Sequence, residues 1–228
     1  MKVFAFLLLT ICSSAISSEI HVDLENLTNK AKQCSATLCA ESEFIGYTTK
    51  PNDKHRFARS VDLSGLDWAF WFGNDQKIAK PNADFIGPVT TFGKVTFIEN
   101  QAVHGNQFYW ENGQSSDYQD ESVFSAAIRH GGFSFQVSPN KIGAFQLDLY
   151  SHNWLASSDF EVCTPTECIK IMNDITLHMT SIKNSATFTT QTPQDVITIN
   201  YVMAPRQYDF DQSNGYHAIE AVKLTEVK

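Results

Sequence analysis

The chain has 228 residues and a formal net charge of −8, because 25 acidic side chains outnumber 17 lysine and arginine side chains. This balance argues against a nucleic-acid-binding protein, since such proteins use basic side chains to contact phosphates. It argues equally against adhesion to an anionic lipid surface.

The first residues are typical of a secretory signal peptide. Lys2 supplies a positive charge, and residues 3–11 (VFAFLLLTI) form an apolar segment that is too short to cross a bilayer. The small residues that follow predict cleavage after Ala15, with Ser17 as the alternative. No later stretch is long and apolar enough for a membrane span, so we expect a secreted protein, extracellular or periplasmic, without one.

Residues 16–59 differ from the rest of the chain and are interpreted as an N-terminal extension. The polar run 50–59 (KPNDKHRFAR) is typical of a surface loop that joins this extension to the core. A short helix over about residues 23–34 is predicted by a helical spacing of three or four residues between Leu24, Leu27, Ala31 and Cys34.

From residue 60 to 228 the pattern changes to short alternating runs separated by Gly, Pro, Asn and Asp. Phe145, Leu147 and Leu149, for example, share one face of a strand. Many short strands without helices between them predict an all-β domain, a two-sheet antiparallel β-sandwich of the jelly-roll type. The expected strands are 60–63, 66–72, 84–86, 94–99, 107–111, 122–129, 132–137, 143–151, 158–163, 174–180, 185–191, 195–203 and 216–226.

Five cysteines are present, and the first falls within the predicted signal peptide. The other four form two C-x4-C pairs, Cys34 with Cys39 and Cys163 with Cys168. An even number of cysteines in an exported chain predicts disulfides, and we favour the two local pairs among the three possible connectivities. A four-cysteine zinc site is the alternative, although such sites usually space their ligands two to four residues apart.

The region from about residue 58 to 228 resembles a β-sandwich module of exported bacterial proteins. That module opens on a Leu-Asp-Trp-x-x-Trp-Gly strand, continues through an aromatic-Trp-x-x-Gly segment to a Gly-Phe-Ser-Phe strand, and ends in antiparallel strands. The last strand, residues 217–224, is similar to the closing strand of galactose-binding-like jelly rolls. The matching residues are Leu66, Asp67, Trp68 and Trp71, then Phe108, Trp110 and Gly113, then Gly132, Phe133, Ser134 and Phe135.

The chain departs from that pattern at Phe72, which is inserted between Trp71 and Gly73 and leaves open which way Trp71 faces. A regular strand would put Trp68 and Phe70 on one face and Trp71 on the other. The resemblance implies a galactose-binding-like jelly roll, a fold whose members often bind sugars or act as accessory domains. It therefore implies a glycan or a cell-surface component as the partner.

Aromatic side chains at strand ends are the candidate ligand-binding residues, because aromatic faces stack on the C–H faces of sugar rings and binding residues concentrate on loops. Neighbouring amides and carboxylates would bind the sugar hydroxyls. Packing of the aromatic side chains in the core is the alternative. The candidates are Trp110, Tyr109, Tyr118 and Trp154, with Asn112, Asp117 and Asn153.

The acidic segment 209–215 predicts a possible structural calcium site. Asp209, Asp211 and Ser213 fall at positions 1, 3 and 5 of a calcium loop, and Glu220 falls at position 12. The glycine of the loop is misplaced for an EF-hand, so a looser calcium site or a solvated acidic turn are the two interpretations.

Catalytic signatures are absent from the sequence, which has no G-x-S-x-G elbow, no H-E-x-x-H and no P-loop. We therefore expect a non-catalytic recognition protein that binds a glycan or a cell-surface component. The alternatives are a structural or protein–protein interaction domain of an envelope or matrix, and an unrecognised polysaccharide hydrolase or lyase.

Overall fold

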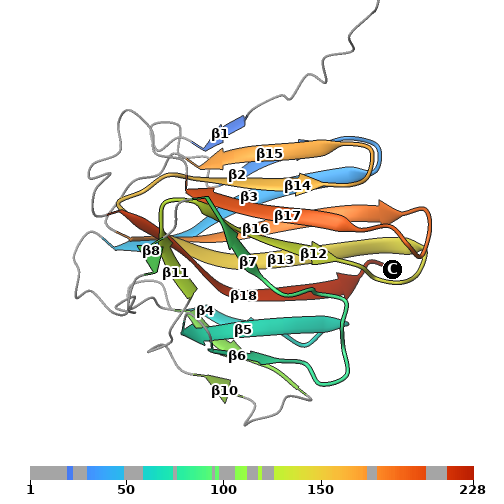
Figure 1. Ribbon diagram of the computed structural model, residues 1–228, viewed down its shortest axis with the longest axis horizontal. Helices are drawn as coiled ribbons and strands as arrows, with labels where there is room; N and C mark the ends of the chain where they lie inside the picture. The colour runs from blue at the N-terminus through green and yellow to red at the C-terminus, as the bar shows by residue number, and fades with distance from the viewer. Residues whose placement is uncertain are drawn as a thin grey trace, which may run out of the picture.

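The computed structural model describes residues 20–22, 30–48, 59–73, 76–93, 96–97, 106–111, 118–119, 126–173, 179–203 and 215–228. Every regular element in these ranges is a β-strand, and they contain no helix that could cross a membrane (Figure 1). The predicted signal peptide, residues 1–15, lies outside the described residues. The all-β prediction is confirmed.

One large sheet has six strands in the spatial order β1, β15, β14, β17, β12 and β7. Neighbouring strands are antiparallel except β1, which runs parallel to β15. Every second residue of β17 is buried, as expected for a strand with one face on a core. The strands are β1 (Ile20–Val22), β7 (Thr90–Phe92), β12 (Gly132–Val137), β14 (Ser158–Cys163), β15 (Cys168–Asn173) and β17 (Ile197–Met203).

The second large sheet has nine antiparallel strands and is built around β18. On one side β18 pairs with β13, and on the other it pairs first with β11 and then with β5. The strands are β2 (Lys30–Cys34), β3 (Leu38–Thr48), β5 (Asp67–Gly73), β6 (Gln76–Ala79), β8 (Thr96–Phe97), β11 (Ala126–Arg129), β13 (Gly143–Trp154), β16 (Met179–Thr190) and β18 (Tyr216–Glu226).

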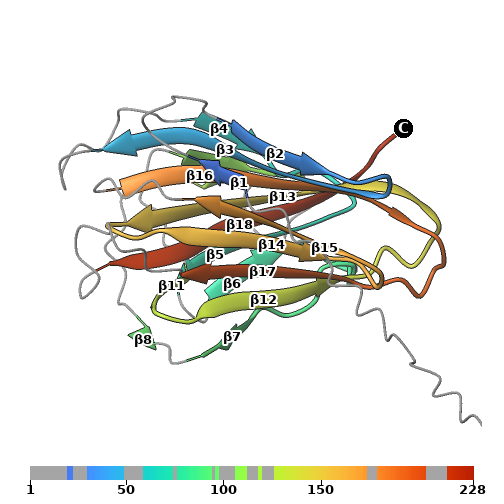
Figure 2. The same cartoon turned by 90° about the horizontal axis from the view of Figure 1, so that it is seen from above.

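The main core fills the space between the two large sheets, so the predicted two-sheet sandwich is confirmed. Figure 2 shows the strands of both sheets running along the same long axis. Apolar side chains from both sheets are buried there: Phe133, Phe135, Phe160, Ile199 and Tyr201 from the six-stranded sheet, and Phe145, Leu147, Leu149, Phe188 and Leu224 from the nine-stranded sheet.

A small third sheet covers part of the other face of the nine-stranded sheet. Its strands are β4 (Arg59–Asp62), β9 (Asn106–Tyr109) and β10 (Tyr118–Gln119). Apolar side chains between these two sheets form a second core. Trp68 and Phe70 of β5 lie in this second core, whereas Trp71 lies in the main core. The predicted division of the aromatic side chains between two faces is therefore correct.

The helix predicted over residues 23–34 is wrong in the part that the structure describes. Residues 30–34 form β2, which pairs with β3 in a hairpin, and residues 23–29 lie outside the described ranges. Ala31 is buried while Lys30 and Lys32 are exposed, so the local period is two. Of the four residues whose spacing suggested a helix, Ala31 is the one that the structure describes as buried, and its burial fits the alternation of a strand equally well.

The predicted N-terminal extension also needs correction, because residues 38–48 form β3 of the nine-stranded sheet. This strand pairs with β16 from Leu38 to Thr48. Leu38 and Ala40 are buried in the main core, while Glu41 faces outward and binds Lys30 at 2.5 Å. The sandwich therefore begins well before residue 60.

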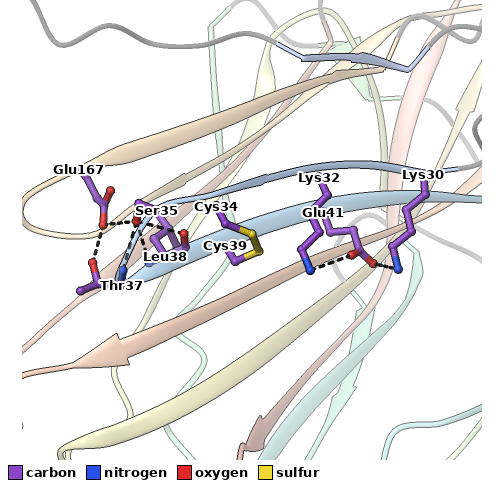
Figure 3. The surroundings of a disulfide bond; sticks show 9 residues. All are labelled: Lys30, Lys32, Cys34, Ser35, Thr37, Leu38, Cys39, Glu41 and Glu167. Carbon is purple, nitrogen blue, oxygen red and sulfur yellow. Dashed lines mark hydrogen bonds and ion pairs between the residues drawn. A yellow bond between two sulfur atoms is a disulfide. The ribbon is translucent and has the colours of Figure 1, made fainter.

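Both predicted local disulfides are confirmed, and the zinc alternative is excluded because the sulfur atoms are bonded in pairs. Each disulfide closes the tip of a hairpin, β2–β3 or β14–β15. The two tips are joined by Glu167, whose carboxylate accepts hydrogen bonds from Ser35 Oγ at 2.8 Å and Thr37 Oγ1 at 2.5 Å (Figure 3). One carboxylate thus links a hairpin of each large sheet.

Candidate functional site

A pocket of about 460 Å³ lies at the edge of the sandwich, and we call it the edge pocket. One wall comes from β5 and β6, and the other comes from residues 80–88, which connect the nine-stranded sheet to the six-stranded sheet. Its volume falls within the range typical of small-ligand sites. The lining residues are Asp67, Trp68, Ala69, Trp71, Lys77, Ala79, Lys80, Pro81, Asn82, Ala83, Asp84, Ile86, Gly87 and Pro88.

Asp67 holds the two walls of the edge pocket together. Its Oδ1 accepts a hydrogen bond from the Trp68 amide, and its Oδ2 accepts one from the Ile86 amide, both at 2.8 Å. Burial raises the pKa of Asp67, although the amides of Ile86, Trp68 and Phe85 and the charge of Lys80 oppose the shift. Asp67 as a whole is only 2% exposed, and its carboxylate links β5 to the connection from inside the protein.

The connection is also tied to the six-stranded sheet. The Gly87 amide donates to the Gln136 carbonyl and the Ser138 amide donates to the Phe85 carbonyl, each at 2.8 Å. These bonds attach residues 85–87 to the end of β12. The outer wall of the pocket is therefore anchored on both sheets, which preorganises it for a ligand.

Lys80 is fixed at the base of the pocket by backbone carbonyl groups. Its ammonium donates to Gly65 O at 2.6 Å and to Leu66 O at 3.2 Å. Gly65 is required here, because a Cβ atom at this position would lie 2.6 Å from the Leu224 carbonyl oxygen. Close packing of the chain against β18 thus places the ammonium of Lys80.

The edge pocket combines an apolar back with a polar rim. Trp71 is 6% exposed and packs with Ala69, Ala79 and Ile86 at the back. Three exposed polar side chains stand at the rim: Lys77, Asn82 and Asp84. Asn82 adopts a left-handed backbone with φ of 59°, which asparagine tolerates better than most residues.

Trp110, the leading aromatic candidate, is fully buried and is not accessible to a ligand. It packs in the second core against Trp68, with ring centroids 5.0 Å apart, and against Phe70 at 5.7 Å. This corrects the prediction of a sugar platform at Trp110. The reason is that Trp110 directly follows β9, a strand of the small third sheet, and this sheet packs on the nine-stranded sheet, which was not expected from the sequence.

The remaining predicted ligand residues do not form one described site. Asn153 is 1% exposed, because its amide binds Ser158 and its carbonyl accepts from Tyr201, so it is an interior residue. Trp154 is partly buried and stacks on Tyr216 with ring centroids 6.3 Å apart. Tyr109 is 40% exposed on β9. Asn112, Asp117 and the side chain of Tyr118 lie outside the described residues.

Glu220 is an interior residue of β18, which corrects its place in the predicted calcium site. It occupies a β-bulge, since the register with β13 passes from Ala221 to Ile219. Its carboxylate is fully buried and binds His152 Nδ1 at 2.8 Å and Asn106 Nδ2 at 2.9 Å. Asp209, Asp211 and Ser213 lie outside the described residues, which themselves hold no cluster of three metal-ligating side chains.

Sequence reasoning missed the rim residues of the edge pocket. Residues 84–86 were expected as a strand, but they belong to the connection and contribute only a bridge from Ile86 to Val137. The available signal was the run Lys80-Pro81-Asn82-Ala83-Asp84, whose proline and asparagine predict a turn directly after the tryptophan-rich strand.

Comparisons with known proteins assign no family to the chain. No family model matches it, and no curated protein matches it. Among solved structures, the chain is similar to TmCBM61, a carbohydrate-binding module determined in complex with beta-1,4-galactotriose. The alignment has 11% identity and a TM-score of 0.35, and it covers 61% of this chain and 88% of that one. A likeness at this level assigns neither a family nor a ligand.

Proposed function

We propose that this protein recognises a glycan and that the edge pocket holds one of its sugar units. The observation that carries this proposal is the pairing of an apolar back around Trp71 with the exposed rim of Lys77, Asn82 and Asp84. A sugar presents C–H faces and hydroxyl groups side by side, so it needs both kinds of surface. Small-ligand sites commonly combine an apolar lining with a few placed polar groups.

Each rim residue supplies a different hydrogen-bonding capacity. Asp84 accepts bonds from hydroxyl groups, Lys77 donates to sugar oxygens, and the amide of Asn82 does both. The anchoring of the outer wall by Asp67 and by β12 reduces the ordering cost on binding. The pocket is thus built for recognition of a polar ligand with an apolar face.

We further propose that the protein is exported and that its role is non-catalytic. Two disulfides support an oxidising compartment. Glycoside cleavage uses a pair of carboxyl groups that flank the sugar bond. In the edge pocket Asp84 is exposed, but Asp67 is buried and engaged with backbone amides, so the described pocket supports binding better than cleavage.

A glycan-array screen of the mature protein, followed by calorimetry on the best ligand, tests the proposal. We expect Lys77→Ala and Asp84→Ala each to weaken binding about tenfold, because each removes a charge-assisted hydrogen bond. Lys32→Ala and Glu111→Ala are matched controls, since both residues are exposed and neither lines the pocket. Equal binding by the pocket and control variants would show that the glycan binds elsewhere. A chelator arm tests for a calcium requirement from residues 209–213.

A further inference from the structure

The edge pocket brings two lysine side chains together on an acidic protein, beside two carboxyl groups, Asp67 and Asp84. The whole chain carries a formal charge of −8, yet two of its 17 basic side chains line this one pocket, Lys77 and Lys80. Both sit beside the apolar back formed around Trp71. A ligand in the pocket therefore meets two ammonium groups.

Neither ammonium group forms an ion pair within 4 Å of a carboxylate in the described part of the chain, although the charge of Lys80 acts on the buried carboxylate of Asp67. The ammonium of Lys80 is held by the carbonyl oxygens of Gly65 and Leu66, which fix its position but leave its full charge in place. An ammonium has three donors, so Lys80 retains one for a ligand. Lys77 is exposed on β6, and its charge is available at the mouth of the pocket.

The two carboxyl groups of the pocket differ from the ammonium groups in their exposure and hydrogen bonding. Asp67 is buried within the wall and is turned toward the amides of Trp68 and Ile86. Asp84 is exposed at the rim and makes no ion pair with Lys77 or Lys80 among the described residues. The pocket thus carries two ammonium groups, one buried carboxylate in its wall and one exposed carboxylate at its rim.

We propose that the edge pocket selects a sugar that carries an anionic group, a carboxylate or a sulfate, and that Lys77 and Lys80 bind this group. The inference rests on the proposed glycan recognition and names the class of glycan. A hydrogen bond between an ammonium and an anionic oxygen is stronger than one between neutral groups. Lys80 offers the anion an ammonium group held in place by two carbonyl oxygens, and Lys77 binds the anion from the rim.

Calorimetry with three soluble polysaccharides tests the inference: polygalacturonate, which bears carboxylates, carrageenan, which bears sulfates, and neutral galactan. We expect at least one anionic polymer to bind about tenfold more tightly than galactan, as one charge-assisted bond would provide. The preferred polymer identifies the anionic group. Its affinity should fall as salt is raised, because salt screens exposed charges.

Variants separate a specific contact from general attraction. Lys77→Gln should weaken binding of the anionic polymer about tenfold and weaken any galactan binding much less, because glutamine still donates a hydrogen bond to a neutral sugar oxygen, while Lys77→Arg should retain the affinity. Lys32→Gln is the matched control, because Lys32 is exposed on β2 and outside the pocket. Asp84→Asn keeps hydrogen bonding but removes the like charge, so it should weaken binding of the anionic polymer much less than Asp84→Ala does.

The outcomes distinguish this inference from the proposed function. Galactan binding that equals or exceeds that of both anionic polymers would overturn the anionic preference and leave glycan recognition standing. An equal loss in Lys77→Gln and Lys32→Gln would also overturn it, because the attraction would then belong to the whole surface. Absence of binding to any glycan, on the array or in solution, would overturn both proposals.

Discussion

We expect one buried histidine, His217, to cost the protein about 2 kcal/mol of stability between pH 7 and pH 5. His217 lies on β18 with no exposed surface, and its ring meets Phe133 and Tyr201 at centroid distances of 5.3 Å. Burial lowers the pKa of His217 to about 3; the backbone of Tyr201 opposes the shift and the charge of His152 adds to it.

The sign and size of this effect follow from proton linkage. A histidine whose pKa is depressed by folding contributes stability that is present above its unfolded pKa of about 6.5 and is lost as the pH falls toward the folded value. Each pH unit below 6.5 lowers the free energy of unfolding by about 1.4 kcal/mol, because the unfolded chain binds a proton at His217 that the folded protein does not bind. At pH 5 the accumulated cost is about 2 kcal/mol.

Urea unfolding of the wild type and of His217→Phe at pH 7 and pH 5 measures the effect. Phenylalanine keeps an aromatic ring against Phe133 and Tyr201 but cannot take up a proton. Every other titrating group contributes to both proteins, so the wild type should lose about 2 kcal/mol more than the variant on acidification. Equal losses would refute the argument, and His217→Gln provides the same comparison if the phenylalanine variant does not fold.

Three further changes test the second core and the edge pocket. Asp67→Asn removes a carboxyl group whose pKa is raised by burial. The wild type should lose stability as this group ionises, so the stability of the variant relative to the wild type, measured by urea unfolding, should increase as the pH rises from 3 to 7. Gly65→Ala forces a Cβ atom to 2.6 Å from the Leu224 carbonyl, and thermal unfolding should show a loss of about 1–3 kcal/mol. Trp110→Ala should cost about 3–5 kcal/mol in urea unfolding, whereas Tyr109→Ala, at a 40% exposed neighbour, should cost much less. A Trp110→Ala protein of unchanged stability would contradict its place in the core.

Much of the fold was predictable because alternation of side chains is a local property. Strands 132–137, 158–163 and 216–226 have the expected bounds. The first two bury mainly one face, whereas 216–226 is buried on both faces, between the main core and the second core. The disulfides were predictable because four-residue spacing and an even count favour local pairs. The strand Cys168–Asn173 was missed, although the disulfide at its first residue was expected.

The candidate site was predictable only in part. The opposite facing of Trp68 and Trp71 follows from the pleat of a single strand and was anticipated correctly. The burial of Trp110 was not, because it depends on β4 pairing with β9, two segments that are distant in the sequence. The rim of the edge pocket was missed for a similar reason. The connection that carries most of it is held in place by a hydrogen bond from the Ile86 amide to Asp67, nineteen residues earlier in the chain.

The sequence by itself determined that this protein is built from paired strands with local disulfides, because periodicity and cysteine spacing are encoded within a few residues. The tertiary structure alone decided which aromatic side chains are covered and where a ligand can enter. A strand has two faces, and its own residues show which face is apolar but not which other segment will cover it. That choice is made by contacts between distant segments, such as the packing of Trp110, at the end of β9, on β5, and the hydrogen bond from the Ile86 amide to Asp67 that holds the connection beside β5.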